Sequence, residues 1–190
     1  MRLFSLDTSF SFLNFSVIED GKVVLCHYVD NDRKTLEHLP LELRRYGIEP
    51  ETFDAYAVSL GVGYATSLRI GITFLKTLAY LQKKPIVGYE NLKLMCLYTP
   101  RIEEKVCALK VSSSVFYREC KGKSAGDIGK GELPEDKTII SLKGQGLGGI
   151  ELEFFPFSLY GGLWAYERLK EGYAGDNPFS LEPIYLRPGV

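Results

Sequence analysis

The chain has 190 residues, of which 45% are hydrophobic and 13% aromatic, so it is long enough to bury a core as one domain or two small lobes. Its 23 basic and 24 acidic residues leave a formal net charge of -1, which excludes the basic surface of a stand-alone nucleic-acid binder. No apolar run approaches the roughly 20 residues of a membrane span, so we expect a soluble protein without membrane contact.

The first half of the chain alternates between strand and helix patterns. Aromatic and β-branched runs separated by short polar turns predict a three-stranded antiparallel meander at 1–7, 10–20 and 21–30. Apolar residues at helical spacing then predict helices at 34–47 and 66–82. Short strands are predicted at 52–61, between the two helices, and at 84–90, after the second helix. The predicted order is therefore strand, strand, strand, helix, strand, helix, strand.

The second half carries weaker patterns. We expect a helix at 90–98, two strands around a serine-rich turn within 105–120, a strand at 137–144 and a helix at 157–172. The Gly- and charge-rich stretch 121–136 is interpreted as an exposed connection. The proline-rich tail is expected to be extended, with Tyr185 and Leu186 packed back onto the body.

The cysteines and histidines are interpreted as structural. Four cysteines lie far apart and form no CxxC pair, which predicts reduced, mostly buried thiols in a cytoplasmic protein: Cys26, Cys96, Cys107 and Cys120. The two histidines, His27 and His38, lack metal-ligand spacing to each other or to a cysteine pair, so no protein-bound transition metal is expected.

Three short stretches resemble phosphate-binding loops, and two of them contain glycines. Gly144, Gly146 and Gly149 form a G-x-G-x-x-G, but a strand pattern and Pro156 follow where a dinucleotide site needs a helix. The turn formed by Asp7, Thr8 and Ser9 suits either a phosphate with hydrated magnesium or an ordinary tight turn. Gly61 and Gly63 likewise suit either an anion at a helix N-terminus or a backbone that needs positive φ.

Several motifs together resemble the TsaB (YeaZ) family of tRNA threonylcarbamoyladenosine biosynthesis. The family's IDTS turn matches Leu6–Ser9, and its closing P-x-Y-L-R matches residues 183–187. Its pattern G-P-G-S-F-T-G-L-R-I-G aligns with residues 61–71, where the matching residues are Gly61, Gly63, Thr66, Leu68, Arg69, Ile70 and Gly71. The departures from that pattern are Val62, Tyr64, Ala65 and Ser67.

This resemblance implies an α/β, actin-like ATPase fold, similar to sugar kinases and Hsp70, with two small lobes that each hold a mixed sheet flanked by helices. We expect an N-terminal lobe at 1–99 and a smaller, reduced C-terminal lobe with an extended tail at 100–190. The resemblance further implies a non-catalytic partner of TsaD, which transfers threonylcarbamoyl to adenosine 37 of tRNA. A TsaE-like ATPase would be the third component, and the chain alone would form a homodimer. It would meet tRNA only indirectly, through the complex.

The resemblance also bears on catalysis. Members of the superfamily normally carry an acidic residue in the first hairpin of the second lobe, but Lys110, Val111 and Ser112 stand in that turn here. We therefore expect no catalytic residues and no resident cofactor, with ATP or ADP only at the complex interface. Asp7, Thr8, Ser9, Gly61 and Gly63 would be a vestigial phosphate site, and the glycine loop serves packing.

Two other functions are weighed. An active small ATPase or kinase of the same fold would use the Asp7–Ser9 turn, but the missing acid and the short chain oppose it. A peptidase is disfavoured because His27 follows Cys26 in a strand and so faces the other way.

The partner surface is expected on the two helices of the first half. Phe74 and Leu78 would be its buried anchors, Gly71 would admit a partner helix, and Leu39 and Leu43 would match them on the first helix. The alternative is that Phe74 and Leu78 belong to the core of the lobe itself.

Overall fold

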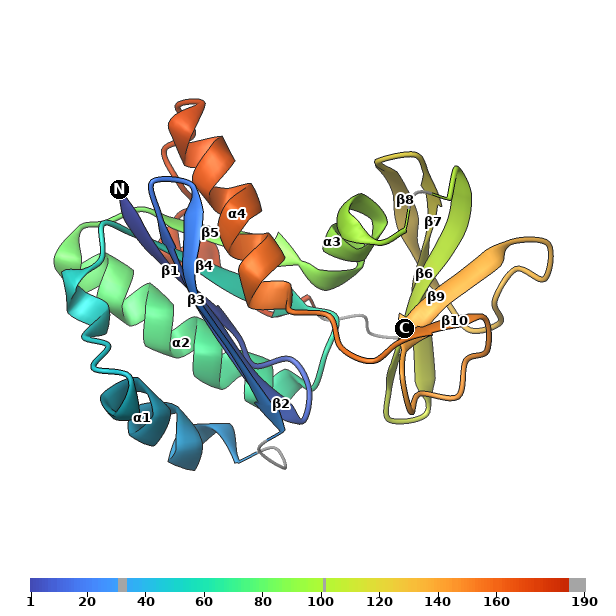
Figure 1. Cartoon of the computed structure of the whole chain (residues 1–190), viewed down its shortest axis with the longest axis horizontal. Coiled ribbons are helices and arrows are strands. Elements are labelled where there is room, and N and C mark those ends of the chain that lie inside the picture. Colours follow the sequence, from blue (N-terminus) through green and yellow to red (C-terminus); the bar gives the residue numbers. More distant parts are fainter. Residues whose placement is uncertain (31–33, 101, 185–190) are drawn as a thin grey trace. The chain divides into compact units, whose positions relative to one another are not determined.

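The computed structural model describes residues 1–30, 34–100 and 102–184 (Figure 1). Its helices are α1 (Thr35–Arg45), α2 (Ala65–Gln82), α3 (Asn91–Tyr98) and α4 (Phe157–Lys170), with 3-10 turns η1 (Pro50–Thr52) and η2 (Pro178–Ser180). Its strands are β1 (Arg2–Asp7), β2 (Phe12–Glu19), β3 (Lys22–Asp30), β4 (Ala55–Gly61), β5 (Ile86–Glu90), β6 (Glu104–Val111), β7 (Ser114–Lys121), β8 (Ser124–Lys130), β9 (Thr138–Leu142) and β10 (Ile150–Leu152).

The first sheet has the order β3-β2-β1-β4-β5. β1 pairs antiparallel with β2 and β2 with β3, which confirms the predicted meander, whereas β1 pairs parallel with β4. The predicted order of strands and helices up to residue 90 is also confirmed.

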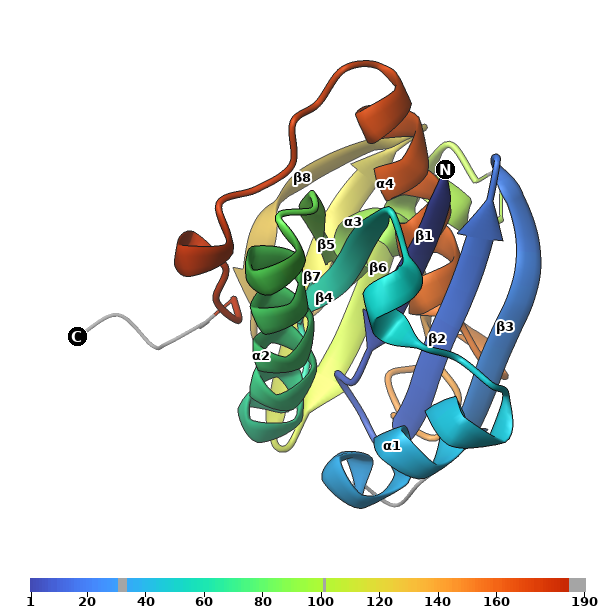
Figure 2. The same ribbon diagram turned by 90° about the vertical axis from the view of Figure 1, so that its left-hand side faces the viewer.

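Helices cover both faces of this sheet. α1 and α2 lie on one face and α4 lies on the other, as Figures 1 and 2 show. β1 and β4 are therefore buried on both sides and consist almost entirely of apolar or small residues. α4 begins where the side chain of Asn14 accepts a hydrogen bond from Ser158 N at 2.8 Å, which satisfies one of the free N–H groups of its first turn.

The core beneath α1 and α2 combines aromatic rings from the sheet with aliphatic side chains from α2. The ring of Phe4 lies 5.9 Å from that of Phe15 and 5.4 Å from that of Phe53, in tilted geometry. Leu68, Ile72 and Leu75 of α2 are all at most 1% exposed and pack into this cluster. One stripe of α2 is thus committed to the core, and another side of the helix contacts the tail, where Lys76 Nζ donates to Leu181 O and the ring of Tyr80 meets that of Phe179.

Residues 90–155 form a second compact unit. Its mixed sheet has the order β10-β9-β6-β7-β8, and α3 packs against β6 and β7. A buried ion pair, in which Arg118 Nη2 lies 2.6 Å from Glu90 Oε2, joins the start of this unit to β7. The predicted hairpin within 105–120, the strand at 137–144 and the helix at 90–98 are confirmed.

The structure corrects three of the expectations about the second half. The stretch 121–136 contains β8, an edge strand that pairs with β7 through backbone hydrogen bonds although it buries little side-chain surface. The compact units are 1–89 with 156–190 and 90–155, so the boundary expected after residue 99 does not match them, because α4 returns to pack on β1, β2 and β4. The tail contains the single turn η2 instead of being extended throughout.

The thiols also differ from expectation. Cys96 and Cys120 are joined in a disulfide with a Cα–Cα distance of 5.5 Å, and Cys26 is exposed; Cys107 is a buried free thiol, as expected. Spacing in the sequence carried no sign of the pairing, because the two cysteines meet only when α3 packs on β7.

The tail is held to the first unit as far as it is described. Leu181 is 5% exposed, and Ile184 N donates a hydrogen bond to Leu60 O at 2.8 Å. Tyr185 and Leu186, which were expected to pack onto the body, lie outside the described residues. Among the described residues, every helix falls short of the length or apolarity that a membrane crossing needs.

Candidate functional site

The turn after β1 is buried and internally bonded. Asp7, Thr8 and Ser9 are each at most 2% exposed. Asp7 Oδ1 accepts a hydrogen bond from Ser9 N at 3.0 Å, and Thr8 Oγ1 donates to Ser67 O at 2.6 Å. The polar groups of this turn thus tie β1 to the first turn of α2.

The glycine loop at 61–64 lies directly against this turn. A Cβ on Gly63 would be 2.4 Å from Ser9 O, and Tyr64 N donates to that same oxygen at 2.7 Å. Gly61, with φ of 111°, adopts a conformation that side chains rarely tolerate. Close packing between loop and turn accounts for Gly63, and the positive φ accounts for Gly61; phosphate binding by these residues stays a prediction.

Gly71 faces the interior of its own unit. A Cβ at this position would lie 2.6 Å from Thr8 Oγ1 and 3.5 Å from Leu6 Cδ2. The expectation that Gly71 admits a partner helix is therefore wrong, because the close neighbour is the turn after β1. The helix period alone did not distinguish the inward face of α2 from the outward one, since both are apolar.

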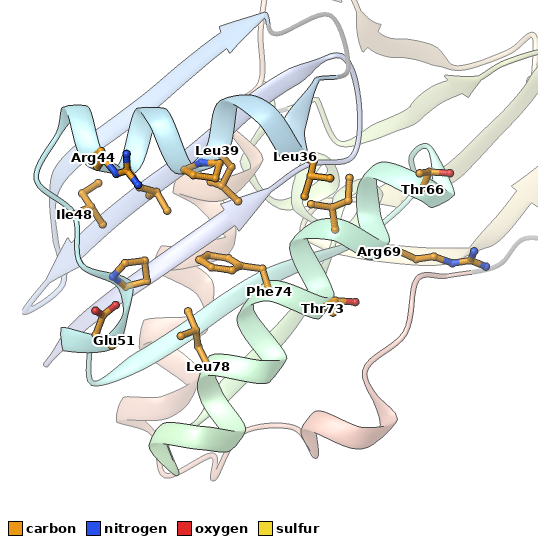
Figure 3. A pocket seen from close by; sticks show the side chains of 14 residues that line it. Leu36, Leu39, Arg44, Ile48, Glu51, Thr66, Arg69, Thr73, Phe74 and Leu78 are labelled. Carbon is orange, nitrogen blue, oxygen red and sulfur yellow. The ribbon is translucent and has the colours of Figure 1, made fainter.

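An apolar groove of about 720 Å³ runs between α1 and α2. Figure 3 shows Phe74 extending from α2 into the space between the helices, with Leu78 one turn further along and Leu36 on α1. The lining residues are Leu36, Leu39, Pro40, Leu43, Arg44, Ile48, Pro50, Glu51, Thr66, Arg69, Ile70, Thr73, Phe74 and Leu78. The groove is mostly apolar, and among its described lining residues the charged ones are Arg44, Glu51 and Arg69.

The residues expected at a partner surface divide by burial. Leu39 and Leu43 are 4% and 6% exposed and belong to the core, so they form the groove floor. Phe74 and Leu78 are partly buried and pack against the edge of that core. Packing against the core therefore holds for both residues, which also line the groove; their role as anchors for a partner stays a prediction.

Three apolar lining residues were not predicted from the sequence: Leu36, Ile48 and Ile70. Leu36 is 70% exposed although it shares the apolar stripe of α1 with Leu39 and Leu43. An exposed leucine on the core-facing stripe of a helix indicates that the stripe extends beyond what the unit itself covers. Leu41, 60% exposed on the same helix, does not line the groove.

Behind α1, a histidine joins the helix to β3. His27 stacks on the ring of Phe15 at 4.5 Å, and its Nε2 lies 3.8 Å from Glu42 Oε2. Burial lowers the pKa of His27 from its ordinary value of 6.5, while the charge of Glu42 acts in the opposite direction. α1, which forms one wall of the groove, therefore packs against a titratable side chain, His27.

The hairpin between β6 and β7 turns at Ser112, which has φ of 55°. Lys110 N donates to Gln145 Oε1 at 2.9 Å. Residues 109–117 contain no carboxylate.

The fold has solved relatives. The structure titled YeaZ from Pseudomonas aeruginosa matches with a TM-score of 0.72 at 18% identity, over 97% of this chain and 99% of that one. The chain has the YeaZ fold. A second structure, titled an uncharacterized protein with similarity to peptidase YEAZ from Pseudomonas aeruginosa, matches equally well over 98% and 99% of the two chains. The expected actin-like ATPase fold, with two mixed sheets flanked by helices, is thereby confirmed.

Sequence comparisons match tRNA N6-adenosine threonylcarbamoyltransferases over part of the chain. The family model described as TsaD: tRNA N6-adenosine threonylcarbamoyltransferase matches residues 40–113, from the middle of α1 to the β6–β7 turn. A tRNA N6-adenosine threonylcarbamoyltransferase of Thermomicrobium roseum is 44% identical over 55 residues, 29% of this chain and 15% of that protein. The one from Phytoplasma australiense is 29% identical over 126 residues, 56% of this chain and 38% of that protein. The chain thus spans less than half the length of these two relatives.

Proposed function

We propose that this chain takes part in tRNA N6-threonylcarbamoyladenosine biosynthesis as a non-catalytic partner of a TsaD-type threonylcarbamoyltransferase. The observation that carries the proposal is the apolar groove between α1 and α2, on a chain that has the YeaZ fold. The match of residues 40–113 to the TsaD model supports the same pathway. In this proposal the partner transfers threonylcarbamoyl to adenosine 37, and this chain holds the partner in its working conformation.

The chemistry of the groove suits a helix of a partner protein. Leu36, Phe74 and Leu78 offer aliphatic and aromatic surface of the kind that anchors protein interfaces, while charges lie only at a few positions along the lining. A groove lined by the side chains of two helices accepts the apolar stripe of a third helix. When TsaD is absent, α1 and α2 of a second copy would cover the same surface and give a homodimer.

The non-catalytic role rests on two features. The β6–β7 turn at Lys110–Ser112 lacks a carboxylate that could activate water, and Asp7 is fully buried with Oδ1 bonded to Ser9 N. A carboxylate that must hold hydrated magnesium needs access to solvent and ligand. A nucleotide, a TsaE-like ATPase and tRNA would therefore engage the assembled complex and not this chain alone.

The alternative is an active small ATPase of the actin-like fold. The position of Asp7, Thr8 and Ser9 between two strands of the sheet favours it, because that turn is where the fold could hold a phosphate. Purified chain would then hydrolyse ATP without a partner, and Asp7→Ala would abolish the hydrolysis. Under our proposal the isolated chain does not hydrolyse ATP, and the Asp7→Ala variant does not hydrolyse it either.

The proposal is tested by reconstitution. TsaD, TsaE and the enzyme that makes threonylcarbamoyl-adenylate, all from the source organism, are assayed for modified adenosine in tRNA with and without this chain. We expect product only when this chain is present, and equal product with Asp7→Ala if that variant is folded by circular dichroism. Full activity without the chain would remove the proposed role.

A further inference from the structure

Three cysteines converge inside the unit formed by residues 90–155. Cys96 lies on α3, Cys107 on β6 and Cys120 on β7, and all three are at most 3% exposed. Their Sγ atoms lie within 4.8 Å of one another. The Cys96–Cys120 disulfide uses two of these sulfurs, and Cys107 lies beside it as a free thiol.

This spacing of sulfurs approaches what one metal ion requires. Thiolates bound to zinc at about 2.3 Å in tetrahedral geometry lie roughly 3.8 Å from one another. Cys107 Sγ is already within 4.8 Å of both partners, so the main change needed is for the two bonded sulfurs to separate. Reduction of their bond permits that separation through side-chain rotation, while α3, β6 and β7 keep the three residues together.

The charges around the cluster favour a divalent ion. Three thiolates and one divalent cation carry a net charge of -1, and Lys105, 2% exposed, places its positive charge within electrostatic reach of Cys107. The Nζ of Lys105 donates to the neutral Pro100 O at 3.0 Å. Arg118, a buried cation on β7, is paired with Glu90. A monovalent ion would leave a second buried negative charge uncompensated, which is costly.

The small size of the unit adds a reason for a cross-link. Compact units of this size seldom gain enough stability from a single apolar core, and disulfides or structural metal ions are the common supplements. A disulfide joins α3 to β7 only, whereas an ion held by all three sulfurs would also include β6.

We propose that the cluster is a redox-dependent binding site for one thiophilic divalent cation, with Zn²⁺ as the expected ion. A dithiol reductant supplies two electrons and two protons to the Cys96–Cys120 bond and is itself oxidised to a disulfide. The cation then displaces three protons from the three thiols, and water or a small anion completes the tetrahedral coordination. The oxidised chain, in which two sulfurs are bonded to each other, does not bind the ion.

The first test uses the unmodified full chain. Protein reduced anaerobically with a phosphine and then freed of reductant is mixed with one equivalent of Zn²⁺, treated with iodoacetamide, and mapped by mass spectrometry. We expect Zn²⁺ to slow alkylation of Cys96, Cys107 and Cys120 together and to leave Cys26 unchanged. Alkylation rates of the three buried cysteines that are equal with and without Zn²⁺ overturn the proposal, as does protection of Cys96 and Cys120 without Cys107.

The second test measures stoichiometry and affinity. Titration of reduced protein with Cd²⁺ should give an ultraviolet thiolate-to-metal charge-transfer band that saturates at one equivalent and is displaced by excess Zn²⁺. Cys107→Ser should weaken binding by more than the roughly 10- to 100-fold that loss of an outer-shell partner costs. Cys26→Ser, which removes the exposed cysteine, is the matched control and should titrate like the wild type.

A second substitution at Cys107 covers the case in which the first variant does not fold. Cys107→Ala serves in place of Cys107→Ser when circular dichroism shows that the serine variant is unfolded, since alanine adds no buried hydroxyl. A folded Cys107 variant that binds Cd²⁺ as tightly as the wild type contradicts the proposal. So does an unchanged charge-transfer band in protein whose disulfide is intact, because that form has only one free buried thiol.

Discussion

At the scale of single residues, the contact between Gly63 and Ser9 shows that the loop before α2 packs directly against the turn after β1. Backbone of the loop approaches backbone of the turn so closely that any side chain at 63 would overlap Ser9 O. The hydroxyl of Thr8 is bonded to Ser67 O in the same region. These contacts fix the position of the first turn of α2 relative to β1, and α2 forms one wall of the groove.

Gly63→Ala tests this contact. The overlap with a backbone oxygen cannot be relieved by a side-chain rotation, so we expect a loss of about 3 kcal/mol in the free energy of unfolding, measured by urea denaturation. Gly47→Ala is the control: it has open space but φ of 62°, and should cost only about 1 kcal/mol. Equal losses in the two variants would mean that the close approach is not what glycine provides at 63.

At the scale of elements, α1 is attached to the sheet partly through His27. Because burial favours the neutral imidazole, the unfolded chain takes up a proton at higher pH than the folded chain does. The stability that neutral His27 contributes is thus complete well above pH 6.5 and is lost as the pH falls through the lower pKa of the folded state.

The expected result is a free energy of unfolding that declines from about pH 7.5 to about pH 5, with a smaller decline in His27→Gln. Urea titrations at the two pH values give both slopes. His38→Gln retains His27 and should behave like the wild type. A His27→Gln slope as steep as that of the wild type would assign the pH dependence to other groups.

Leu78→Asp distinguishes two roles of Leu78, which packs against the core and also lines the groove. Leu78 is only partly buried, so the chain should stay folded with a loss of about 1–2 kcal/mol, whereas Leu75→Asp, at a fully buried position, should unfold it. Binding to a partner should weaken by at least about 2 kcal/mol, roughly 30-fold in Kd, because a carboxylate would be taken out of water. An unfolded Leu78→Asp chain would show that this position belongs to the core alone.

The sequence predicted those elements whose pattern is dictated by local physics. Alternating apolar residues in the meander and the 3.6-residue period of α2 have few competing interpretations, and both are confirmed. β8 was missed because an edge strand is stabilised by pairing with β7 and needs little apolar surface. The inward direction of Gly71 and the meeting of three cysteines depend on tertiary packing, which periodicity and spacing in one sequence do not encode.

At the scale of the whole molecule, the chain combines the YeaZ fold with the non-catalytic role proposed for it. The YeaZ fold extends over nearly the entire chain, whereas the matches to the transferase family cover a part of it. The groove on the first unit is the feature through which such a chain would act on a larger partner. The partner's affinity for this groove is therefore the central quantity.

That affinity is measured most directly by titrating TsaD from the source organism into this chain by calorimetry, with two exposed leucines of α1 compared. Leu36→Asp places a charge in the groove, and Leu41→Asp places the same charge on the same helix outside it; both should stay folded, since the side chains are 70% and 60% exposed. The account predicts a complex with wild type and Leu41→Asp, and binding at least about 30-fold weaker with Leu36→Asp. No complex with the wild type, or equal affinities for the two variants, would contradict it.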